Sequence, residues 1–238
     1  MKSIGIVIPA YNEKENIIRL IKKIRKDLDC LIIIVDDSSD LKTKKIIIEN
    51  KLKNVRYFNR GKKLGRGSAV IFGFKKILKL RKNISCLIEM DADLSHNPSE
   101  LKRNIKYFHN NSLDLLIGSR YLSGSKIINW PLSRRILSKL SNTLARVLIG
   151  APINDYTNGY RFYSKSAAKT IIQKCNNTSG FIILSEIILV LWIKKFKISE
   201  IKSIFKNRVR GESSVDLSLI IESLIGLFKL YLFKKNLV

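Results

Sequence analysis

The sequence predicts an α/β protein in which helices cover both faces of a mostly parallel sheet. Two observations support this fold class. Short apolar runs alternate with amphipathic segments through the first half of the 238 residues, and clusters of polar residues follow several of those runs. Alternation of strand and helix patterns is typical of parallel sheets, because each connection between parallel strands has to cross the sheet. Ligands of such sheets bind beyond the carboxyl ends of the strands, which is where the polar clusters lie.

The elements of the first half follow one another regularly. Five apolar runs are expected to be strands: Ile4–Ile8, Leu31–Val35, Val55–Phe58, Cys86–Met90 and Leu113–Ile117. Four segments between them repeat apolar residues at helical spacing: Glu15–Lys26, Lys42–Lys51, Ala69–Leu80 and Pro98–Phe108. The first, second, fourth and fifth runs are followed by PAYNE, DDSS, DAD and GSRY. We therefore expect these four polar clusters to share one edge of the sheet.

The second half is less regular. A basic amphipathic segment, Trp130–Gly150, precedes the turn-rich stretch NDYTNGYRFY. A helix is expected at Ile182–Ile193 and a strand at Ile198–Phe205, followed by the charged loop NRVRGESS.

A last amphipathic segment ends the chain. Over Asp216–Phe233 apolar residues recur at helical spacing, with lysines beside them. Such a helix lies at a membrane interface, or it packs on its own domain or on a partner subunit. We therefore predict a main domain of residues 1–216 and a C-terminal helical extension of residues 217–238.

The composition restricts the class of protein. With 27% charged and 45% hydrophobic residues, the chain has a globular composition. Its 45 Lys and Arg residues against 19 acids give a formal charge of +26, which predicts a polyanionic partner or reflects solvated, lysine-rich helix faces. The three cysteines form no CxxC pair, which predicts buried thiols in a reducing compartment. The sequence contains no run of about 20 apolar residues, so we expect no membrane span. The N-terminus becomes polar too soon for a signal peptide.

Two aspartates end the fourth predicted strand, in LIEMDADLSH. Asp91 and Asp93 are two residues apart, so on extended backbone their carboxylates point to the same side. Two such carboxylates stay ionised together only beside a positive charge. Mg²⁺ is a natural candidate, because it uses one or two carboxylates together with phosphate oxygens. Alternatively, Asp93 or Ser95 caps the helix that Pro98 begins.

Acidic residues also follow the neighbouring strands. Asp36 and Asp37 follow LIIIV, a position where an acid commonly accepts hydrogen bonds from a nucleoside, although they could also help to start the next helix. Tyr11 and Glu13, after the first strand, supply an aromatic face and another carboxylate. Three acidic strand ends in one sheet favour a ligand site over three separate helix caps.

Taken together, PAYNE, DDSS, DAD, NDYTNGYR and RVRGES resemble, in order and spacing, the motifs of inverting family 2 glycosyltransferases of the Rossmann-like GT-A fold. Within that family the dolichol-phosphate (polyprenyl-phosphate) mannosyltransferase group is most similar, from Ile4 to about Leu217. The resemblance implies transfer of a hexose, mannose or glucose, with inversion. The donor would be a nucleotide-diphosphate sugar of the GDP-mannose or UDP-glucose type, and the acceptor a dolichyl or undecaprenyl phosphate. It also implies a divalent cofactor, Mg²⁺ or Mn²⁺.

The resemblance implies a role for individual residues. The nucleotide-sugar would be bound by Pro9, Tyr11, Glu13, Val35, Asp37, Asp91, Ala92, Asp93, Arg208 and Ser214. The catalytic residues would be Asp91, Asp93 and Arg120, and the acceptor phosphate would bind to Arg120, Arg134 and Arg135. The metal would bind to Asp93 and Ser95. Ser95 stands where the family usually has Gln, and Ser214 stands where it often has Lys.

The implied acceptor decides which side chains the reaction requires. A phosphate monoester is already anionic at neutral pH, because its second pKa is about 6, so it needs a cation such as Arg120 rather than a strong base. A hydroxyl acceptor would need a base, and Asp155 is the candidate. For a phosphate acceptor we expect Asp155 and Arg161 to form an architectural pair, with Gly159 permitting the turn. The loop Gly61–Ala69 lacks the P-loop spacing but resembles the family's glycine-rich loop beneath the donor.

Two other functions stay open at this point. One is a family 2 transferase that acts on a sugar or lipid hydroxyl in cell-surface glycan synthesis, although a single glutamine, Gln173, excludes the QxxRW motif of processive synthases. The other is a basic nucleic-acid-binding protein, but acidic strand ends would repel nucleic-acid phosphates, so we expect no nucleic-acid partner.

We expect a cytoplasmic protein that lies peripherally on the cytoplasmic face of a membrane. The basic helix around Arg134–Arg146 and the C-terminal helix would rest on the anionic membrane surface. A membrane-anchoring subunit is a further candidate partner, because no span is predicted in this chain.

Overall fold

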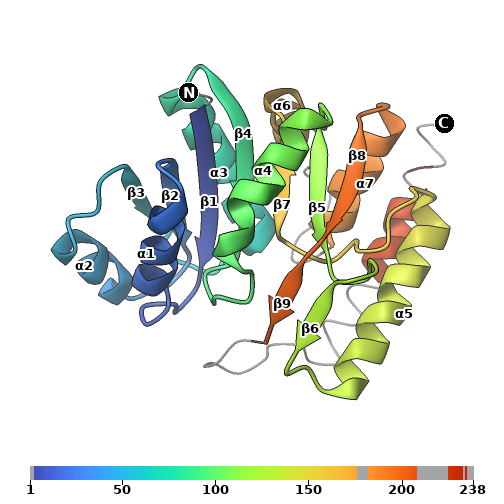
Figure 1. Cartoon of the computed structure of the whole chain (residues 1–238), viewed down its shortest axis with the longest axis horizontal. Helices are drawn as coiled ribbons and strands as arrows, with labels where there is room; N and C mark the ends of the chain where they lie inside the picture. Colours follow the sequence, from blue (N-terminus) through green and yellow to red (C-terminus); the bar gives the residue numbers. More distant parts are fainter. Residues whose placement is uncertain (1–2, 176–181, 208–224, 233, 235–238) are drawn as a thin grey trace.

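The computed structural model describes residues 3–175, 182–207, 225–232 and 234. Within them a seven-stranded sheet has the strand order β3-β2-β1-β4-β7-β5-β8 (Figure 1). The strands are β1 (Ser3–Ala10), β2 (Leu31–Asp36), β3 (Val55–Asn59), β4 (Ile84–Glu89), β5 (Leu115–Ser119), β7 (Arg161–Tyr163) and β8 (Ile198–Lys202). Neighbouring strands are parallel except at β7, which runs antiparallel to both β4 and β5. The mostly parallel α/β sheet predicted from the sequence is confirmed.

Helices cover both faces of this sheet. One face carries α1 (Ile17–Asp27), α2 (Lys42–Glu49) and α4 (Leu101–Asn110), and the other carries α3 (Arg66–Leu80), α6 (Lys165–Lys174) and α7 (Ile183–Ile193). Successive residues of β1 enter opposite cores: Ile6 and Ile8 belong to the cluster of α1 and α4, and Val7 to that of α3. Because both faces are buried, the central strands β1, β2 and β4 are apolar at nearly every position instead of alternating.

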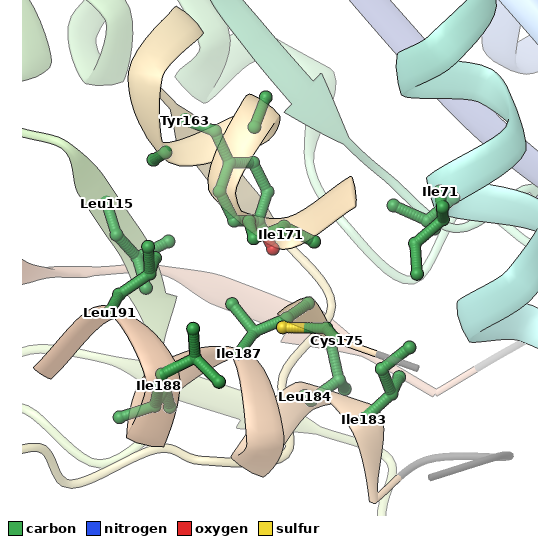
Figure 2. Close-up of a cluster of buried hydrophobic side chains, with 14 of the residues drawn as sticks. Ile71, Leu115, Tyr163, Ile171, Cys175, Ile183, Leu184, Ile187, Ile188 and Leu191 are labelled. Atoms are coloured by element: carbon green, nitrogen blue, oxygen red, sulfur yellow. The ribbon is translucent and has the colours of Figure 1, made fainter. Parts of the chain in front are cut away.

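The core on the α6 and α7 side is the larger of the two. In Figure 2, Ile183, Ile187 and Leu191 of α7 lie among side chains of the sheet and of α6, with Cys175 beside them. Every residue of α7 from 183 to 191 is buried, which explains why the helix is apolar on all sides except at Ser185 and Glu186. All three cysteines are buried and free, as predicted.

Two elements of the central region were not predicted. The stretch NDYTNGYRFY contains β7, which inserts between β4 and β5, and α6 follows directly. A strand of three residues is too short to show a period, and the basic Arg161 at its start disguises it. The helix α6 begins at a side-chain cap, in which Ser164 Oγ accepts a hydrogen bond from the Ala167 N–H.

The strand predicted at Ile198–Phe205 is divided between two sheets. β8 ends at Lys202, and β9 (Ile204–Lys206) then pairs with β6 (Lys126–Ile128) in a separate two-stranded sheet. Glu100, which lies in the short 3₁₀ turn Pro98–Glu100 before α4, explains the break. Its carboxylate accepts hydrogen bonds from Ser203 Oγ at 2.7 Å and from the Ile204 N–H at 3.2 Å, so the backbone leaves the main sheet there.

The predicted basic segment forms α5 (Leu132–Ile149), which lies along the outside of the molecule at the β5–β8 end of the sheet (Figure 1). Of the predicted C-terminal helix, residues 225–232 are described and are helical. Their Leu227 and Leu230 are buried in the α7-side core, and Lys234 Nζ donates to the Ile149 carbonyl at 2.8 Å. The boundary predicted after residue 216 lies outside the described residues. Among the helices that the structure describes, none has the length and apolarity that a membrane crossing requires.

Candidate active site

The polar clusters that follow β1, β2 and β4 meet at one edge of the sheet. The register pairs Ala10 with Asp36 and Val7 with Glu89, so these three strands end side by side. The Asn12 N–H donates to Ser38 Oγ at 2.8 Å, which joins the PAYNE and DDSS clusters directly. For these three of the four predicted clusters, the shared edge is therefore present.

The two aspartates at the end of β2 both accept hydrogen bonds from within the protein. Asp36 is fully buried and accepts hydrogen bonds from Ser38 Oγ at 2.5 Å and from Tyr57 Oη at 2.8 Å. Asp37 accepts from Arg60 Nε at 2.6 Å and from Arg60 Nη2 at 2.8 Å, and also from the backbone N–H groups of Leu64 and Gly65. Asp37 therefore holds the glycine-rich loop against the sheet edge, a role that the sequence did not reveal.

The other residues predicted to bind the nucleoside differ in how exposed their side chains are. Tyr11 is 46% exposed, and Lys63 Nζ lies 5.1 Å from its ring centre, so an aromatic face and a cation stand together at the edge. Pro9 is partly exposed, and Glu13 Oε2 accepts from Asn16 Nδ2 at 2.8 Å. Val35 has no exposed surface and packs in the α3-side core, so it can meet a donor only through its backbone.

The two aspartates of DAD are held differently. Both follow the end of β4, in a turn where Leu94 has a φ of +62°. Asp93 is 9% exposed, and its Oδ1 accepts from the Ser95 N–H at 3.0 Å. Neither Asp93 nor Ser95 caps the next helix, because Asn97 is its N-cap, so the capping alternative does not hold. Between them Ala92 is buried in the α4-side core.

Asp91 is paired with an arginine that the sequence did not identify as part of the site. Arg66 Nε and Nη2 both lie 2.9 Å from Asp91 Oδ1, and Arg66 Nη1 lies 3.5 Å from Glu89 Oε1. Burial alone would lower the pKa of Arg66, but the charges of Asp91 and Glu89 raise it overall, so the guanidinium stays charged. The carboxylates at the end of β4 are thus partly neutralised by the chain itself.

Gly159 has a different structural role from the one predicted. We expected it to permit a turn, but its φ is not positive. A Cβ at this position would instead fall on the guanidinium of Arg66, 2.5 Å from its Cζ and closer still to Nη2, and Arg66 Nη2 donates to the Gly159 carbonyl at 3.2 Å. The missing side chain makes room for Arg66.

A histidine fixes the backbone of the DAD turn. The Asp91 N–H donates to His96 Nδ1 at 3.2 Å, and His96 Nε2 lies 3.0 Å from Asn158 Oδ1. With Nδ1 as acceptor, the neutral ring carries its proton on Nε2 and donates it to Asn158. Burial lowers the pKa of His96, although Asp91 and Asp93 oppose that effect, so we assign the neutral form. The imidazole stacks on Tyr160, with ring centres 5.1 Å apart.

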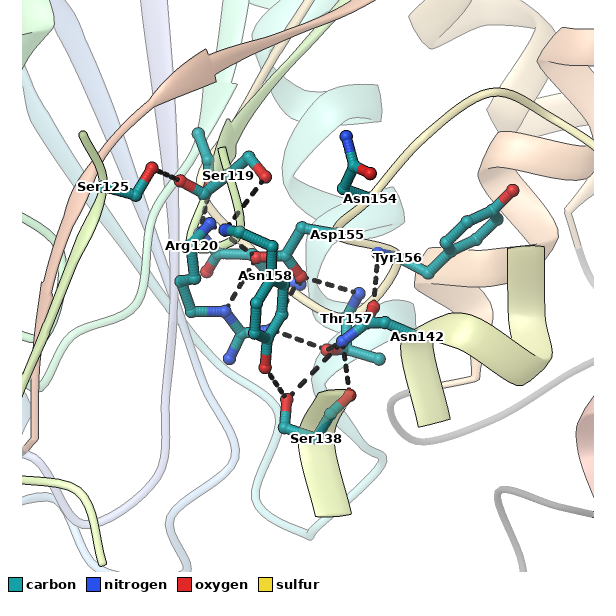
Figure 3. A network of polar contacts seen from close by, with 12 residues as sticks. Ser119, Arg120, Ser125, Ser138, Asn142, Asn154, Asp155, Tyr156, Thr157 and Asn158 are labelled. Carbon is teal, nitrogen blue, oxygen red and sulfur yellow. Dashed lines mark hydrogen bonds and ion pairs between the residues drawn. The ribbon is translucent and has the colours of Figure 1, made fainter. Parts of the chain in front are cut away.

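Arg120 forms a buried ion pair with Asp155 (Figure 3). Arg120 Nε and Nη2 donate to the two oxygens of this carboxylate at 2.8 and 2.7 Å, and Nη2 also donates to Thr157 Oγ1. Burial alone would raise the pKa of Asp155, but the charge and hydrogen bonds of Arg120 lower it overall. The predicted Asp155–Arg161 pair is wrong, because the guanidinium of Arg161 donates to the carbonyls of Asn158, Leu184 and Tyr156.

Trp130 brings two of the predicted phosphate-binding arginines together. Arg120 Cζ lies 5.2 Å and Arg134 Cζ 4.3 Å from the centre of its ring. Arg134 Nη1 also donates to Asn207 at 3.3 Å, and Arg135 Nη2 donates to the Ile127 carbonyl at 2.8 Å. No pattern around Trp130 pointed to this arrangement, because its partners come from three separate places: Arg120 directly after β5, Arg134 in α5 and Phe205 in β9. Two further predicted donor contacts, Arg208 and Ser214, lie outside the described residues.

The residues predicted to bind a metal fit a cation that takes few protein ligands. Ser95 Oγ is buried and has no hydrogen-bond partner among the described residues, and it lies two residues from the Asp93 carboxylate. In the same part of the chain, no three His, Cys, Asp or Glu side chains converge as a complete metal cage would require. One carboxylate and one hydroxyl suit Mg²⁺ or Mn²⁺ that takes its remaining ligands from phosphate and water.

Comparisons with known proteins agree with this geometry. The model of the family described as glycosyl transferase family 2 matches residues 5–172. The polyprenol monophosphomannose synthase of Mycolicibacterium smegmatis is 34% identical over 223 residues, which cover 92% of this chain and 83% of that protein. The dolichol-phosphate mannosyltransferase of Pyrococcus furiosus is 34% identical over 233 residues, which cover 95% of this chain and 63% of that protein.

Solved structures with low sequence identity share the fold. Glucosyl-3-phosphoglycerate synthase from Mycobacterium tuberculosis, crystallised with Mn²⁺, UDP and glucosyl-3-phosphoglycerate, superposes with a TM-score of 0.69 at 16% identity, over 97% of this chain and 80% of that one. Mannosyl-3-phosphoglycerate synthase from Rubrobacter xylanophilus gives 0.68 at 13% identity, over 100% and 76% of the two chains.

Proposed function

This chain belongs to glycosyl transferase family 2 and is a glycosyltransferase of the GT-A fold, and we propose that it transfers a hexose, mannose in the first place, from a nucleotide-diphosphate sugar to a polyprenyl phosphate with inversion. Two relatives at 34% identity support the acceptor, because their names specify polyprenol and dolichol phosphate chemistry. The main observation in this chain that supports the proposal is that both oxygens of the Asp155 carboxylate already accept hydrogen bonds from within the protein.

Asp155 is unavailable as a base. A hydroxyl acceptor would need one, and Asp155 was the candidate from the sequence. Its side chain is fully buried, and its two oxygens accept hydrogen bonds from the Arg120 backbone N–H, from the Arg120 guanidinium and from the backbone of Thr157 and Asn158. A phosphate acceptor needs no such base, because it is already an anionic nucleophile.

The ion pair between Arg120 and Asp155 leaves Nη1 of Arg120 for an anion. Nε and Nη2 bind Asp155 and Thr157, and Nη1 makes no hydrogen bond with the described residues. Trp130 holds Arg134 beside Arg120. The acceptor phosphate would therefore meet Arg120 Nη1 and Arg134, with Arg135 further out on α5, and two arginines suit an oxyanion better than one.

On the donor side, we propose that the nucleotide lies along the PAYNE edge, with its base or ribose against Tyr11 and its sugar facing Asp91. Asp93 and Ser95 would hold Mg²⁺ or Mn²⁺ on the diphosphate, and a bound cation would offset the charge that the leaving diphosphate develops. The Mn²⁺ in the Mycobacterium tuberculosis structure supports a divalent ion of this kind.

The outer face of α5 supports peripheral binding to an anionic membrane. Its exposed apolar residues recur every three or four positions and form one stripe along the helix: Leu132, Ile136, Leu140, Leu144 and Val147. Arg135, Lys139 and Arg146 are exposed beside this stripe. An apolar stripe flanked by cations fits the boundary between acyl chains and anionic headgroups, which is where a polyprenyl phosphate presents its phosphate.

α5 also connects this surface to the acceptor-binding arginines. Tyr121 Oη donates to Ser138 Oγ of α5 at 2.6 Å, and Asn142 of α5 donates to Thr157, which binds Arg120. We therefore propose that the protein lies on the cytoplasmic face of a membrane with α5 against it. A membrane-anchoring subunit stays a prediction.

The acceptor test compares two lipids of equal chain length. Purified protein with Mn²⁺ would receive radiolabelled GDP-mannose, or UDP-glucose in a parallel series, together with either polyprenyl phosphate or the corresponding polyprenol. We expect a labelled lipid phosphosugar from the phosphate and none from the alcohol. Equal transfer to the alcohol, or to a soluble sugar hydroxyl, would establish the alternative family 2 reaction instead.

A further inference from the structure

The two halves of the proposed active site follow strands that are not neighbours in the sheet. The DAD turn, on the donor side, follows β4, and Arg120, on the acceptor side, follows β5. Between these strands lies β7, antiparallel to both. Its first residue, Arg161, pairs with Glu89 at the end of β4 and with Ile117 near the end of β5. The turn that leads into β7 therefore lies at the same edge of the sheet, between the donor side and the acceptor side.

Two side chains join the donor side to the acceptor side across this turn. The Asp91 N–H donates to His96 Nδ1 at 3.2 Å, and His96 Nε2 lies 3.0 Å from Asn158 Oδ1. Because a backbone N–H can only donate, Nδ1 is the acceptor, and Nε2 carries the proton that Asn158 accepts. Asn158 Nδ2 then donates to the Gly118 carbonyl in β5. Each group in this chain of hydrogen bonds donates to the next, from the DAD turn to the strand that precedes Arg120.

Asn158 has a second link to the acceptor side (Figure 3). Its backbone N–H donates to Asp155 Oδ1 at 3.0 Å, and the Asp155 carboxylate accepts from the Arg120 guanidinium at 2.8 and 2.7 Å. Asn158 thus contacts His96 through its side chain and the ion-pair partner of Arg120 through its backbone. A shift of the DAD turn relative to Arg120 therefore has to lengthen or bend at least one of these hydrogen bonds.

Packing fixes the orientation of both side chains. The His96 ring is 1% exposed, stacks on Tyr160 at an angle of 16°, and meets Phe205 in a T-shaped contact with ring centres 5.7 Å apart. Asn158 is 2% exposed. A buried polar group that loses its hydrogen-bond partner destabilises the fold, so both side chains are held in the arrangement that makes these bonds.

We propose that His96 and Asn158 are positioning residues that form a bridge, which sets the distance between a donor sugar at Asp91 and an acceptor phosphate at Arg120. The proposal deepens the proposed function and rests on it for the places of the donor and the acceptor. Neither side chain has to touch a substrate. The bridge acts by holding the two reactants at reacting distance, because a misplacement of about 1 Å can slow a reaction by about a hundredfold.

Two histidine variants open the bridge at different ends. His96→Asn keeps an acceptor near the position of Nδ1 but has no donor that reaches Asn158. His96→Gln keeps a donor near the position of Nε2 but has no acceptor for the Asp91 N–H. We expect kcat to fall by about tenfold or more in both variants, with donor affinity within about twofold of wild type. A mere loss of structure would lower donor binding and its stoichiometry as well.

The main experiment measures kcat, and also the affinity and stoichiometry of donor binding by isothermal titration with Mn²⁺ present. GDP-mannose and UDP-glucose are the two donors. His109→Asn is the matched control, because His109 is the other histidine of the chain and lies in the last turn of α4, before the start of β5 and so at the opposite edge of the sheet. It should keep kcat within about twofold of wild type.

The result that overturns the proposal is a kcat in either His96 variant that stays within about twofold of the control, or a donor affinity or stoichiometry that falls as far as kcat. If one of the two variants does not fold, the other is judged by the same criterion. The assay uses whichever acceptor the wild type accepts. Transfer by the wild type to a hydroxyl alone would therefore reject the proposed acceptor, while the comparison of variants would still decide the role of the bridge.

A double-mutant cycle tests whether His96 and Asn158 act through one hydrogen bond. In an Asn158→Ala background, His96→Asn should lower kcat by less than about twofold, because the partner of Nε2 is already missing. An equal loss in both backgrounds would show that the two residues act independently, and would overturn the bridge. If Asn158→Ala does not fold, Asn158→Ser replaces it with the same criterion.

Discussion

Two aspartate–arginine pairs in this molecule have the same chemistry and different surroundings. Arg120 binds both oxygens of Asp155, with side chains 5% and 0% exposed. Arg66 binds one oxygen of Asp91, whose side chain is 29% exposed. The carboxylate of the first pair has no exposed surface, whereas that of the second keeps access to solvent. Burial, more than the pair itself, decides which carboxylate is architectural and which can act on a substrate.

Loss of one partner from the buried pair should destabilise the protein strongly. Asp155→Ala leaves Arg120 buried without its partner, and we expect a loss of about 3 kcal/mol or more in the free energy of unfolding. Chemical denaturation followed by circular dichroism measures it. Asp29→Ala, at an exposed pair with Arg25, is the control and should cost less than about 1 kcal/mol. Similar losses in the two variants would show that the two classes of pair do not differ.

Loss of the partly exposed partner Asp91 should affect activity much more than stability. In Asp91→Asn we expect transfer to fall by about a hundredfold, because the carboxylate that we propose to face the donor sugar is lost. The free energy of unfolding should change by less than about 1 kcal/mol, because Asp91 keeps access to solvent. Steady-state kinetics and denaturation of one preparation test both statements. A variant that unfolds easily but still transfers sugar at the normal rate would reverse the assignment.

The acid stability of the protein depends on the buried carboxylate of Asp155. The pKa of Asp155 is lower in the folded than in the unfolded chain, where a carboxyl titrates near 4. Its stabilising contribution is therefore complete above that value and is lost as the pH falls below it. Between pH 5 and pH 3, about the range of this titration, we expect the unfolding free energy of wild type to drop more steeply than that of Asp155→Asn. Parallel pH profiles would contradict the lowered pKa.

The smallest expected effect concerns the surface that α5 adds beside the buried pair. The double variant Leu140→Glu, Val147→Glu should weaken binding to phosphatidylglycerol vesicles on the order of tenfold, with little change in unfolding free energy. Vesicle co-sedimentation measures it. Ile48→Glu on α2, at 63% exposure, is the matched control and should leave vesicle binding unchanged. Equal weakening by the control would remove α5 as the membrane surface.

The strand ends of the first half could be predicted from the sequence because the signals are local. Each apolar run stops at a polar cluster, and parallel strands bring their carboxyl ends to one edge. The contacts that decide the roles are not local. Arg66 and Asp91 are 25 residues apart and Arg120 and Asp155 are 35 apart, so no spacing indicates which aspartate meets which arginine.

The errors of prediction have the same origin. Asp155 and Arg161 lie close in sequence and carry opposite charges, but Arg161 is occupied by three backbone carbonyls. β7 is a strand because β4 and β5 pair with it on both sides, and its three residues contain no period of their own. Gly159 looks like a turn glycine in sequence, and only the position of Arg66 shows why a side chain is excluded.

Donor binding is the direct test of the proposal that the DAD edge holds a nucleotide-sugar through Asp93 and a divalent cation. Isothermal titration of GDP-mannose, and of UDP-glucose, into wild type and Asp93→Asn with Mn²⁺ present would measure the affinity. We predict binding of one donor to wild type and at least about a tenfold loss in Asp93→Asn, while Asp29→Asn behaves as wild type. Donor affinity that is the same in Asp93→Asn, and the same when Mn²⁺ is chelated, would contradict the claim.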